Sequence, residues 1–181
     1  VKLWKHHAAQ DKANKINEMA EKMGEKFLAR YGGKISSEWA FPKIWQVLEE
    51  APEVYAEMDY FIEAADWVIW QLTGMQTRNA CTAGYKALYH KKEGYPSKAF
   101  FAALDPRLEN VIEEKMNWPV APLGEKAGEN TAEAANMTGL KEGTAVAVAN
   151  VEARVRGPAE GITEPATQLA IMGPSTGQIL V

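Results

Sequence analysis

The sequence predicts an α/β protein whose first part is mainly helical and whose last part carries short strands. Apolar residues recur at three- and four-residue steps through much of the first half of the chain, as they do on amphipathic helices. Residues 145–149, by contrast, are an unbroken run of small and β-branched apolar residues, which is typical of a strand buried on both faces of a sheet. A hairpin-like pair of strands is expected to follow at 167–172 and 178–181. We therefore expect helices packed against part of a sheet.

Composition places the chain among ordinary globular proteins. Its 181 residues are 46% hydrophobic and 24% charged, and this length is enough for one domain with a real core, or for one and a part. The formal net charge of −4 gives no electrostatic reason to expect a nucleic acid or an anionic membrane as partner. No stretch is long and apolar enough to span a bilayer. The single cysteine, Cys81, excludes an internal disulfide and predicts a cytoplasmic location.

Helix boundaries are predicted from caps and breakers. Ser36 or Ser37 is expected to cap one helix and Asn130-Thr131 another, while glycines at 74 and 139 end helices. The expected helices cover residues 8–30, about 40–50, 53–58, 60–72, 95–104, 107–115 and 132–137. Segment 75–89 mixes glycine, small polar residues and aromatics, so we expect a loop and short strand lining a cleft. Residues 119–124 are expected to form a linker.

Tryptophan positions predict different roles. Trp45, Trp67 and Trp70 are expected in the core because they fall at helical spacing. Trp39 precedes a predicted helix, a junction where an amphipathic ring can face a ligand.

Three features could carry chemistry, and each also has an ordinary structural explanation. Glu152 follows the end of the 145–149 strand, where α/β sheets place catalytic groups, but a solvated turn has the same pattern. Lys86 is a lone cation among small and aromatic residues, either a ligand-binding group or simply solvated. The glycine- and hydroxyl-rich turn 172–177 could offer N–H groups to a phosphate or be a plain hairpin.

His6 and His7 are neighbours pointing about 100° apart on a helix, so we expect no metal site.

Three motifs resemble bacterial L-ribulokinases, members of the FGGY family of carbohydrate kinases. They are Leu3-Trp-Lys-His-His-Ala-Ala-Gln-Asp11, Tyr31-Gly-Gly-Lys-Ile-Ser-Ser-Glu-Trp39 and Thr82-Ala-Gly-Tyr-Lys-Ala87. The resemblance implies a ribonuclease-H-like (actin-like ATPase) fold with sugar deep in a cleft and ATP across it. The chain would come from the interior of a longer enzyme, with its sheet incomplete. Residues 1–140 would be the mainly helical sugar-binding part of the N-terminal domain, and 141–181 the strands with the catalytic carboxylate and second phosphate turn.

The same resemblance implies roles for individual residues. Ala9 and Trp39 would line the sugar pocket, and Lys86 would donate hydrogen bonds to the hydroxyls of an L-ribulose-like sugar. Glu152 would be the general base. The residues expected to meet the ATP phosphates are Gly173, Ser175 and Thr176. ATP and Mg²⁺ are the cofactors that the full-length family implies.

Two departures from the family pattern predict weak or absent catalysis. The family's Gly-Asn-Val-Asp-Ala-His is here Ala149-Asn-Val-Glu-Ala-Arg154, so the carboxylate of Glu152 is one methylene longer. The family's Gly-Thr-Ser is here Gly-Pro-Ser, and Pro174 lacks both an N–H and a hydroxyl. The first phosphate loop would precede Val1 and the adenosine-binding segment would follow Val181, so we expect this chain to bind no ATP.

Two classes of function therefore stay open. The chain is either part of an ATP-dependent ketose kinase, inactive alone, or a non-catalytic degenerate or engineered module for binding or assembly. Strands without their natural partners also predict a homo-oligomer.

Overall fold

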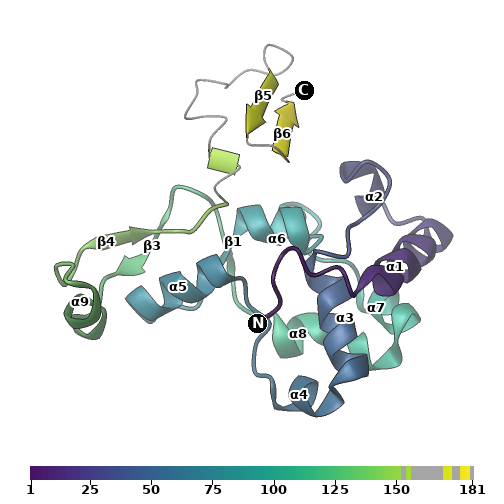
Figure 1. The fold of residues 1–181 in the computed structure, drawn as a ribbon, viewed down its shortest axis with the longest axis horizontal. Coiled ribbons are helices and arrows are strands. Elements are labelled where there is room, and N and C mark those ends of the chain that lie inside the picture. Colours follow the sequence, from purple (N-terminus) through teal and green to yellow (C-terminus); the bar gives the residue numbers. More distant parts are fainter. Residues whose placement is uncertain (152–153, 156–168, 173–175, 180–181) are drawn as a thin grey trace. The chain divides into compact units, whose positions relative to one another are not determined.

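The polypeptide forms two compact units that alternate along the chain. The computed structural model describes residues 1–151, 154–155, 169–172 and 176–179, the last two ranges by their backbone alone. One unit, the helical unit, comprises Val1–Ile62 and Ala83–Trp118; the other, the mixed unit, comprises Glu63–Thr82 and Pro119–Val181. Figure 1 labels most of the elements, which are numbered in chain order. Helix α6, Ala80–Lys86, begins in the mixed unit and ends in the helical one.

Helices enclose the main core of the protein in the helical unit. Besides the end of α6, its elements are α1 (Gln10–Met23), α2 (Phe27–Arg30), α3 (Ala40–Glu50), α4 (Pro52–Glu57), α7 (Lys98–Leu104), the 3-10 helix η1 (Pro106–Leu108) and α8 (Val111–Lys115). Helix α1 packs against α3 and α7. Phe100 and Phe101 of α7 fill the centre, with ring contacts to Phe27 at 5.4 Å and to Phe41 at 4.7 Å. These aromatic contacts join three helices into one core.

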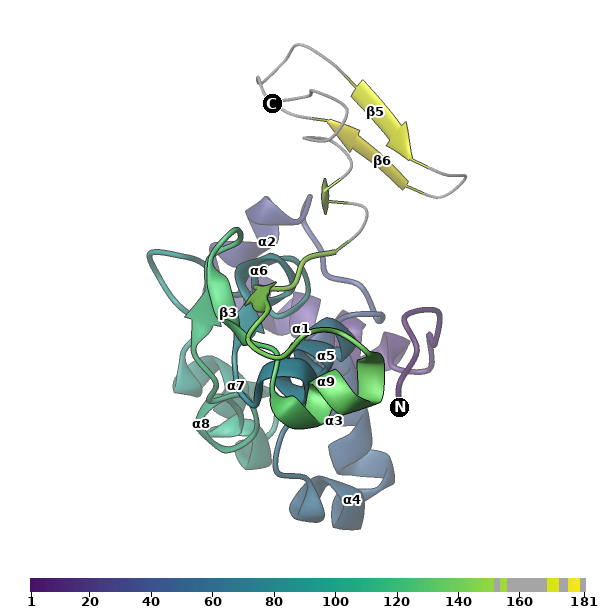
Figure 2. The same cartoon turned by 90° about the vertical axis from the view of Figure 1, so that its left-hand side faces the viewer.

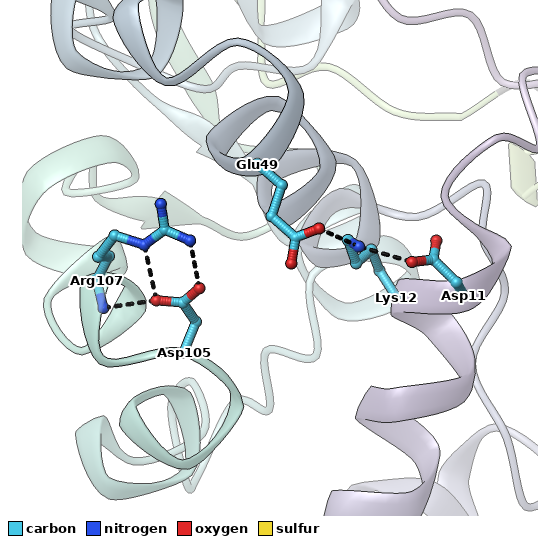
Figure 3. Close-up of polar contacts among 5 residues, drawn as sticks. All are labelled: Asp11, Lys12, Glu49, Asp105 and Arg107. Carbon is cyan, nitrogen blue, oxygen red and sulfur yellow. Dashed lines mark hydrogen bonds and ion pairs between the residues drawn. The ribbon is translucent and has the colours of Figure 1, made fainter.

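A buried lysine connects α1 to α3 (Figure 3). Lys12 is only 6% exposed, and its ammonium forms ion pairs with Asp11 at 2.6 Å and with Glu49 of α3. Two carboxylates thus neutralise a charge that would be costly to bury alone. Nearby, the guanidinium of Arg107 donates to both oxygens of Asp105, at 3.0 and 2.7 Å, and lowers the pKa of that carboxyl.

Several predicted boundaries in the helical unit were wrong for local reasons. The expected helix 8–30 is divided because Gly24 adopts a left-handed φ of 68°, which ends α1. Neither Ser36 nor Ser37 caps α3, whose N-cap residue is Trp39; the hydroxyl of Ser36 accepts a hydrogen bond from the Glu38 N–H instead. Helix α7 begins at Lys98, after its cap Ser97, rather than at residue 95. The expected helix 107–115 is replaced by η1 and α8.

In its described residues, the mixed unit combines helices α5 and α9 and the start of α6 with short strand pairs. Its elements are α5 (Ala64–Thr73), β1 (Arg78–Asn79), the start of α6, β2 (Val120–Ala121), β3 (Lys126–Glu129), α9 (Ala132–Thr138), β4 (Ala145–Ala147), β5 (Leu169–Met172) and β6 (Thr176–Ile179). Strand β1 pairs with β2 in parallel, whereas β3–β4 and β5–β6 are antiparallel pairs. Helix α5 contacts α9 and β3, as Figure 2 shows for α9. A Cβ at Gly128 would lie 2.8 Å from Cβ of Thr73, so this glycine permits the close approach of β3 to α5.

In the mixed unit, the predicted helix caps were confirmed, but the predicted burial of strand β4 was wrong. Thr131 and Gly139 cap α9 as expected, Gly74 ends α5, and β5 and β6 form an expected antiparallel pair. Strand β4, however, is not buried on both faces: Ala145 and Ala147, which lie on the same face of the strand, are exposed.

Other elements of this part of the chain were placed or sized wrongly. Helix α5 begins at Ala64 rather than at residue 60, and Trp67 is 49% exposed rather than in the core. Segment 75–89 contains helix α6, and the expected linker 119–124 contributes β2. In the part of the chain that the structure describes, no helix is long and apolar enough to cross a membrane.

Candidate functional site

Two of the three sequence motifs touch each other at the start of the helical unit. Nδ1 of His7 lies 3.5 Å from Oγ of Ser37, and Nε2 of the same ring lies 3.7 Å from a carboxylate oxygen of Glu38. The segment before α1 is also tied to α3, because Nζ of Lys43 donates to the Leu3 carbonyl at 2.8 Å. The motif at 3–11 therefore lies beside the residues that lead into Trp39.

The third motif meets Trp39 through aromatic rings. The indole of Trp39 lies 4.8 Å from the ring of Tyr31 and 5.7 Å from the ring of Tyr85, measured between centroids. The hydroxyl of Tyr31 donates a hydrogen bond to the Gly84 carbonyl. These contacts leave Trp39 only 9% exposed. The structure thus brings the candidate sugar-packing residue against the segment that carries Lys86.

The loop before Trp39 is held in place by its backbone. Gly32 and Gly33 have φ values of 70° and 94°, which a residue with a side chain rarely adopts. The Ile35 N–H donates to Oδ1 of Asn17 at 2.8 Å, which fastens the loop to α1. Burial raises the pKa of the Tyr31 phenol, so its hydroxyl stays a neutral donor at physiological pH.

Lys86 and Ala9 occupy defined places in the helical unit. Lys86 is the last residue of α6 and is half-buried. The helix stops there because Leu88, buried in the core, adopts a left-handed φ of 60°. Ala9 immediately precedes α1 and is fully buried. Their roles in sugar binding stay predictions.

A hollow of about 250 Å³ lies elsewhere in the helical unit, between the α1–α2 junction and segment 93–96. Its lining includes Lys26, Arg30 and Glu93, and the hydrogen bond from Arg30 lowers the pKa of Glu93. None of the three predicted sugar-binding residues lines it. No residue of the three motifs lines this hollow, so it is separate from their contact.

The predicted catalytic and phosphate-binding residues cannot be placed in the same way. Glu152, Gly173 and Ser175 lie outside the described residues, and Thr176 is described only as the first backbone residue of β6. The described residues include no group of three or more His, Cys, Asp and Glu side chains that could hold a metal ion.

Sequence reasoning missed two residues of the candidate site. Tyr31 and Tyr85 enclose Trp39, yet neither was singled out. Both were visible in the motifs, since Tyr31 opens the second motif and Tyr85 directly precedes Lys86. Aromatic side chains next to glycines in a predicted binding segment are the signal that could have found them.

Comparisons with known proteins find similarity to carbohydrate kinases, the family that the three motifs resemble. Residues 1–153 match the N-terminal domain of the FGGY family of carbohydrate kinases. The whole chain is 58% identical to the ribulokinase of Geobacillus thermodenitrificans, of which it spans 32%. It is 51% identical over 99% of its length to the ribulokinase of Mycolicibacterium smegmatis, again spanning 32% of that protein.

Solved structures share the fold at low sequence identity. The xylulose kinase of Lactobacillus acidophilus matches 86% of this chain and 30% of its own with a TM-score of 0.64 and 14% identity. The xylulose kinase of Rhodospirillum rubrum matches 84% of this chain and 30% of its own with a TM-score of 0.62 and 22% identity. The likeness confirms the predicted α/β, actin-like fold class. Together with the match over residues 1–153, it establishes that the chain belongs to the FGGY family of carbohydrate kinases.

Proposed function

We propose that this chain forms the sugar-binding part of an ATP-dependent kinase that phosphorylates L-ribulose or a similar ketose. The observation that carries the proposal is the meeting of the three motifs around Trp39 in the helical unit. Relatives at 51–58% identity are ribulokinases by name, which supports L-ribulose as the sugar. The reaction would transfer the terminal phosphoryl group of ATP to a sugar hydroxyl. We place it in the cytoplasm, where ATP is available and the Cys81 thiol stays reduced.

The geometry suggests how each residue would act. Trp39 would present an apolar edge to the carbon skeleton of the sugar, and Tyr31 and Tyr85 would keep the indole from turning. Lys86 would donate to sugar hydroxyls as a compact charged group. Ala9 would contribute through its backbone, because its side chain is already buried. Positioning of this kind is a large part of what an enzyme contributes to phosphoryl transfer.

The catalytic step is proposed to depend on residues that this chain carries in altered form. Glu152 would take the proton from the attacking hydroxyl, and Gly173, Ser175 and Thr176 would face the phosphates. ATP would supply the phosphoryl group, and Mg²⁺ would neutralise the charge that develops on it. The longer carboxylate of Glu152 and the missing N–H at Pro174 both weaken this arrangement. We therefore propose that the 181 residues alone do not turn over ATP.

A binding assay and a turnover assay test the proposal together. L-ribulose should raise the melting temperature of the 181-residue chain, and the rise should grow with the logarithm of its concentration above the Kd, whereas glycerol at the same concentrations should not raise it. A coupled ATPase assay with and without L-ribulose should give background rates in both cases. Absence of any shift with L-ribulose would favour the non-catalytic binding or assembly module. Sugar-stimulated ATP turnover would refute the claim of inactivity.

A further inference from the structure

A buried carboxylate in the first turn of α5 is not among the residues assigned above. Asp66 is 2% exposed, and its Oδ1 accepts hydrogen bonds from both the N–H and the side-chain amide of Asn79, at 2.9 and 2.6 Å. Its Oδ2 is buried without a hydrogen-bond partner within the part of the chain that the structure describes. Burial raises the pKa of this carboxyl, while the Asn79 hydrogen bonds and the charge of Arg78 oppose the rise. A group this costly to bury calls for an explanation.

Asn79 connects this carboxylate to α6. Its Oδ1 accepts a hydrogen bond at 2.8 Å from the N–H of Thr82, the third residue of the helix, which is the arrangement of an N-cap. The side-chain amide of Asn79 can cap the helix only if its oxygen faces Thr82 and its nitrogen faces away. The bond from that nitrogen to Asp66 fixes this orientation. Asp66 thereby determines how the cap is presented.

Helix α6 is short enough for its ends to matter. It has seven residues, and a helix of this length is marginal without help at its termini. At its far end the N–H groups of Ala87 and Tyr89 both donate to the Ala83 carbonyl, and Leu88 turns the chain with its φ of 60°. The last residue before this turn is Lys86. A cap at the start of α6 and a buried turn at its end together set where the ammonium-bearing residue stands.

We infer that Asp66 is a positioning residue for sugar binding: it orients Asn79, Asn79 fixes the start of α6, and α6 places Lys86. The inference rests on the proposed role of Lys86 in binding a ketose. It assigns no direct contact with the sugar to Asp66. Asp66 differs from an ordinary structural residue in that its effect on affinity passes through one particular side chain, that of Lys86.

A double-mutant cycle in the 181-residue chain distinguishes positioning from general stabilisation. Asp66→Ala should raise the Kd for L-ribulose about tenfold, equivalent to about 1.4 kcal/mol. Asp66→Asn keeps an acceptor oxygen for Asn79 and should stay within about twofold of the original Kd. Gln71→Ala, an exposed change on the same helix, serves as the matched control and should leave the Kd unchanged. In a Lys86→Ala background, Asp66→Ala should have almost no further effect. Additive losses, or a Kd unchanged by Asp66→Ala, would overturn the inference.

A second measurement keeps the inference separate from the proposed function. If the original chain does not bind L-ribulose, the proposed function fails, and hydrogen exchange then decides the role of Asp66. Asp66→Ala should speed the exchange of the Thr82 and Lys86 amides about tenfold or more relative to amides of α3. Unchanged exchange in α6 would refute the link between Asp66 and Lys86. Should Asp66→Ala fail to fold, Asn79→Ala carries both tests, because it removes the same cap.

Discussion

The rings of Trp39 and Tyr85 lie 5.7 Å apart, which joins two motifs that are distant in the sequence. Trp39 precedes α3, and Tyr85 directly precedes Lys86 at the end of α6. The segment that carries Lys86 therefore contacts the ring of Trp39. The roles of both residues in sugar binding stay predictions.

Trp39 should matter for stability as well as for binding. Trp39→Ala removes a buried ring from between two tyrosines, and large-to-small core changes of this kind cost about 3–5 kcal/mol of unfolding free energy. Trp67→Ala is the matched control, because Trp67 is 49% exposed and should cost well under half as much. Urea unfolding followed by circular dichroism measures both. Equal losses for the two variants would show that Trp39 is not part of the core.

Alkaline pH should destabilise the protein through Tyr55. Burial raises the pKa of this phenol from 10.0 to about 12, so ionisation is harder in the folded than in the unfolded chain. The stability from Tyr55 is therefore complete below about pH 10 and is lost as pH rises towards 12. Between pH 9 and 11 the original chain should lose about 1.4 kcal/mol more unfolding free energy than Tyr55→Phe. Parallel pH dependences for the two proteins would contradict the shift.

The fold class and many caps could be predicted because they depend on local sequence. Thr131 and Gly139 delimit α9 through hydrogen bonds and backbone angles that span only a few residues. Elements decided by distant partners could not be predicted in this way. Strands β1 and β2 have two residues each and exist because Arg78–Asn79 pairs with Val120–Ala121. A run such as 145–149 predicts a buried strand, but only its partners decide whether both faces are covered.

The same distinction applies to the candidate site. Trp39 and Lys86 were found because they stand in motifs that resemble a known family. Asp66 was not found, because in the predicted helix 60–72 a single carboxylate looks like an ordinary solvated charge. Only the fold shows that it is buried and bonded to Asn79. Helix α6 was missed because its glycine and polar residues have low helix propensity, and its cap and turn compensate for that.

Strand β4 should make the isolated chain self-associate. Among the described residues β4 is paired along one edge only, and an unpaired apolar edge is available to a second copy. Ala147→Lys places a charge at this edge and should yield a monomer in sedimentation velocity, whereas the original chain should sediment faster as concentration rises. Asn136→Lys, an exposed change of the same charge on α9, is the control. A clean monomer for the original chain at all concentrations would contradict the proposal.

Repair of the two departures from the family should recover catalysis in a longer protein. The chain would replace the corresponding part of a full-length ribulokinase, and Glu152→Asp and Pro174→Thr would then be introduced singly and together. A carboxylate displaced by about 1 Å can cost about 100-fold in rate, so Glu152→Asp should raise kcat. Pro174→Thr should also raise kcat, because it returns an N–H and a hydroxyl at that position. The KM for sugar should change little with either repair. Coupled spectrophotometric assays measure both constants. Turnover equal to the parent enzyme without either repair would show that the two substitutions are harmless.

The most direct test of the sugar-binding account is a calorimetric titration of the 181-residue chain with L-ribulose in the absence of nucleotide. The account predicts saturable binding at one site, and a Kd raised about tenfold or more in Lys86→Ala by loss of a charged hydrogen-bond donor. Lys91→Ala, which removes an exposed lysine a few residues along, should bind like the original chain. A folded Lys86→Ala variant with the original affinity, or no binding by the original chain, would contradict the account.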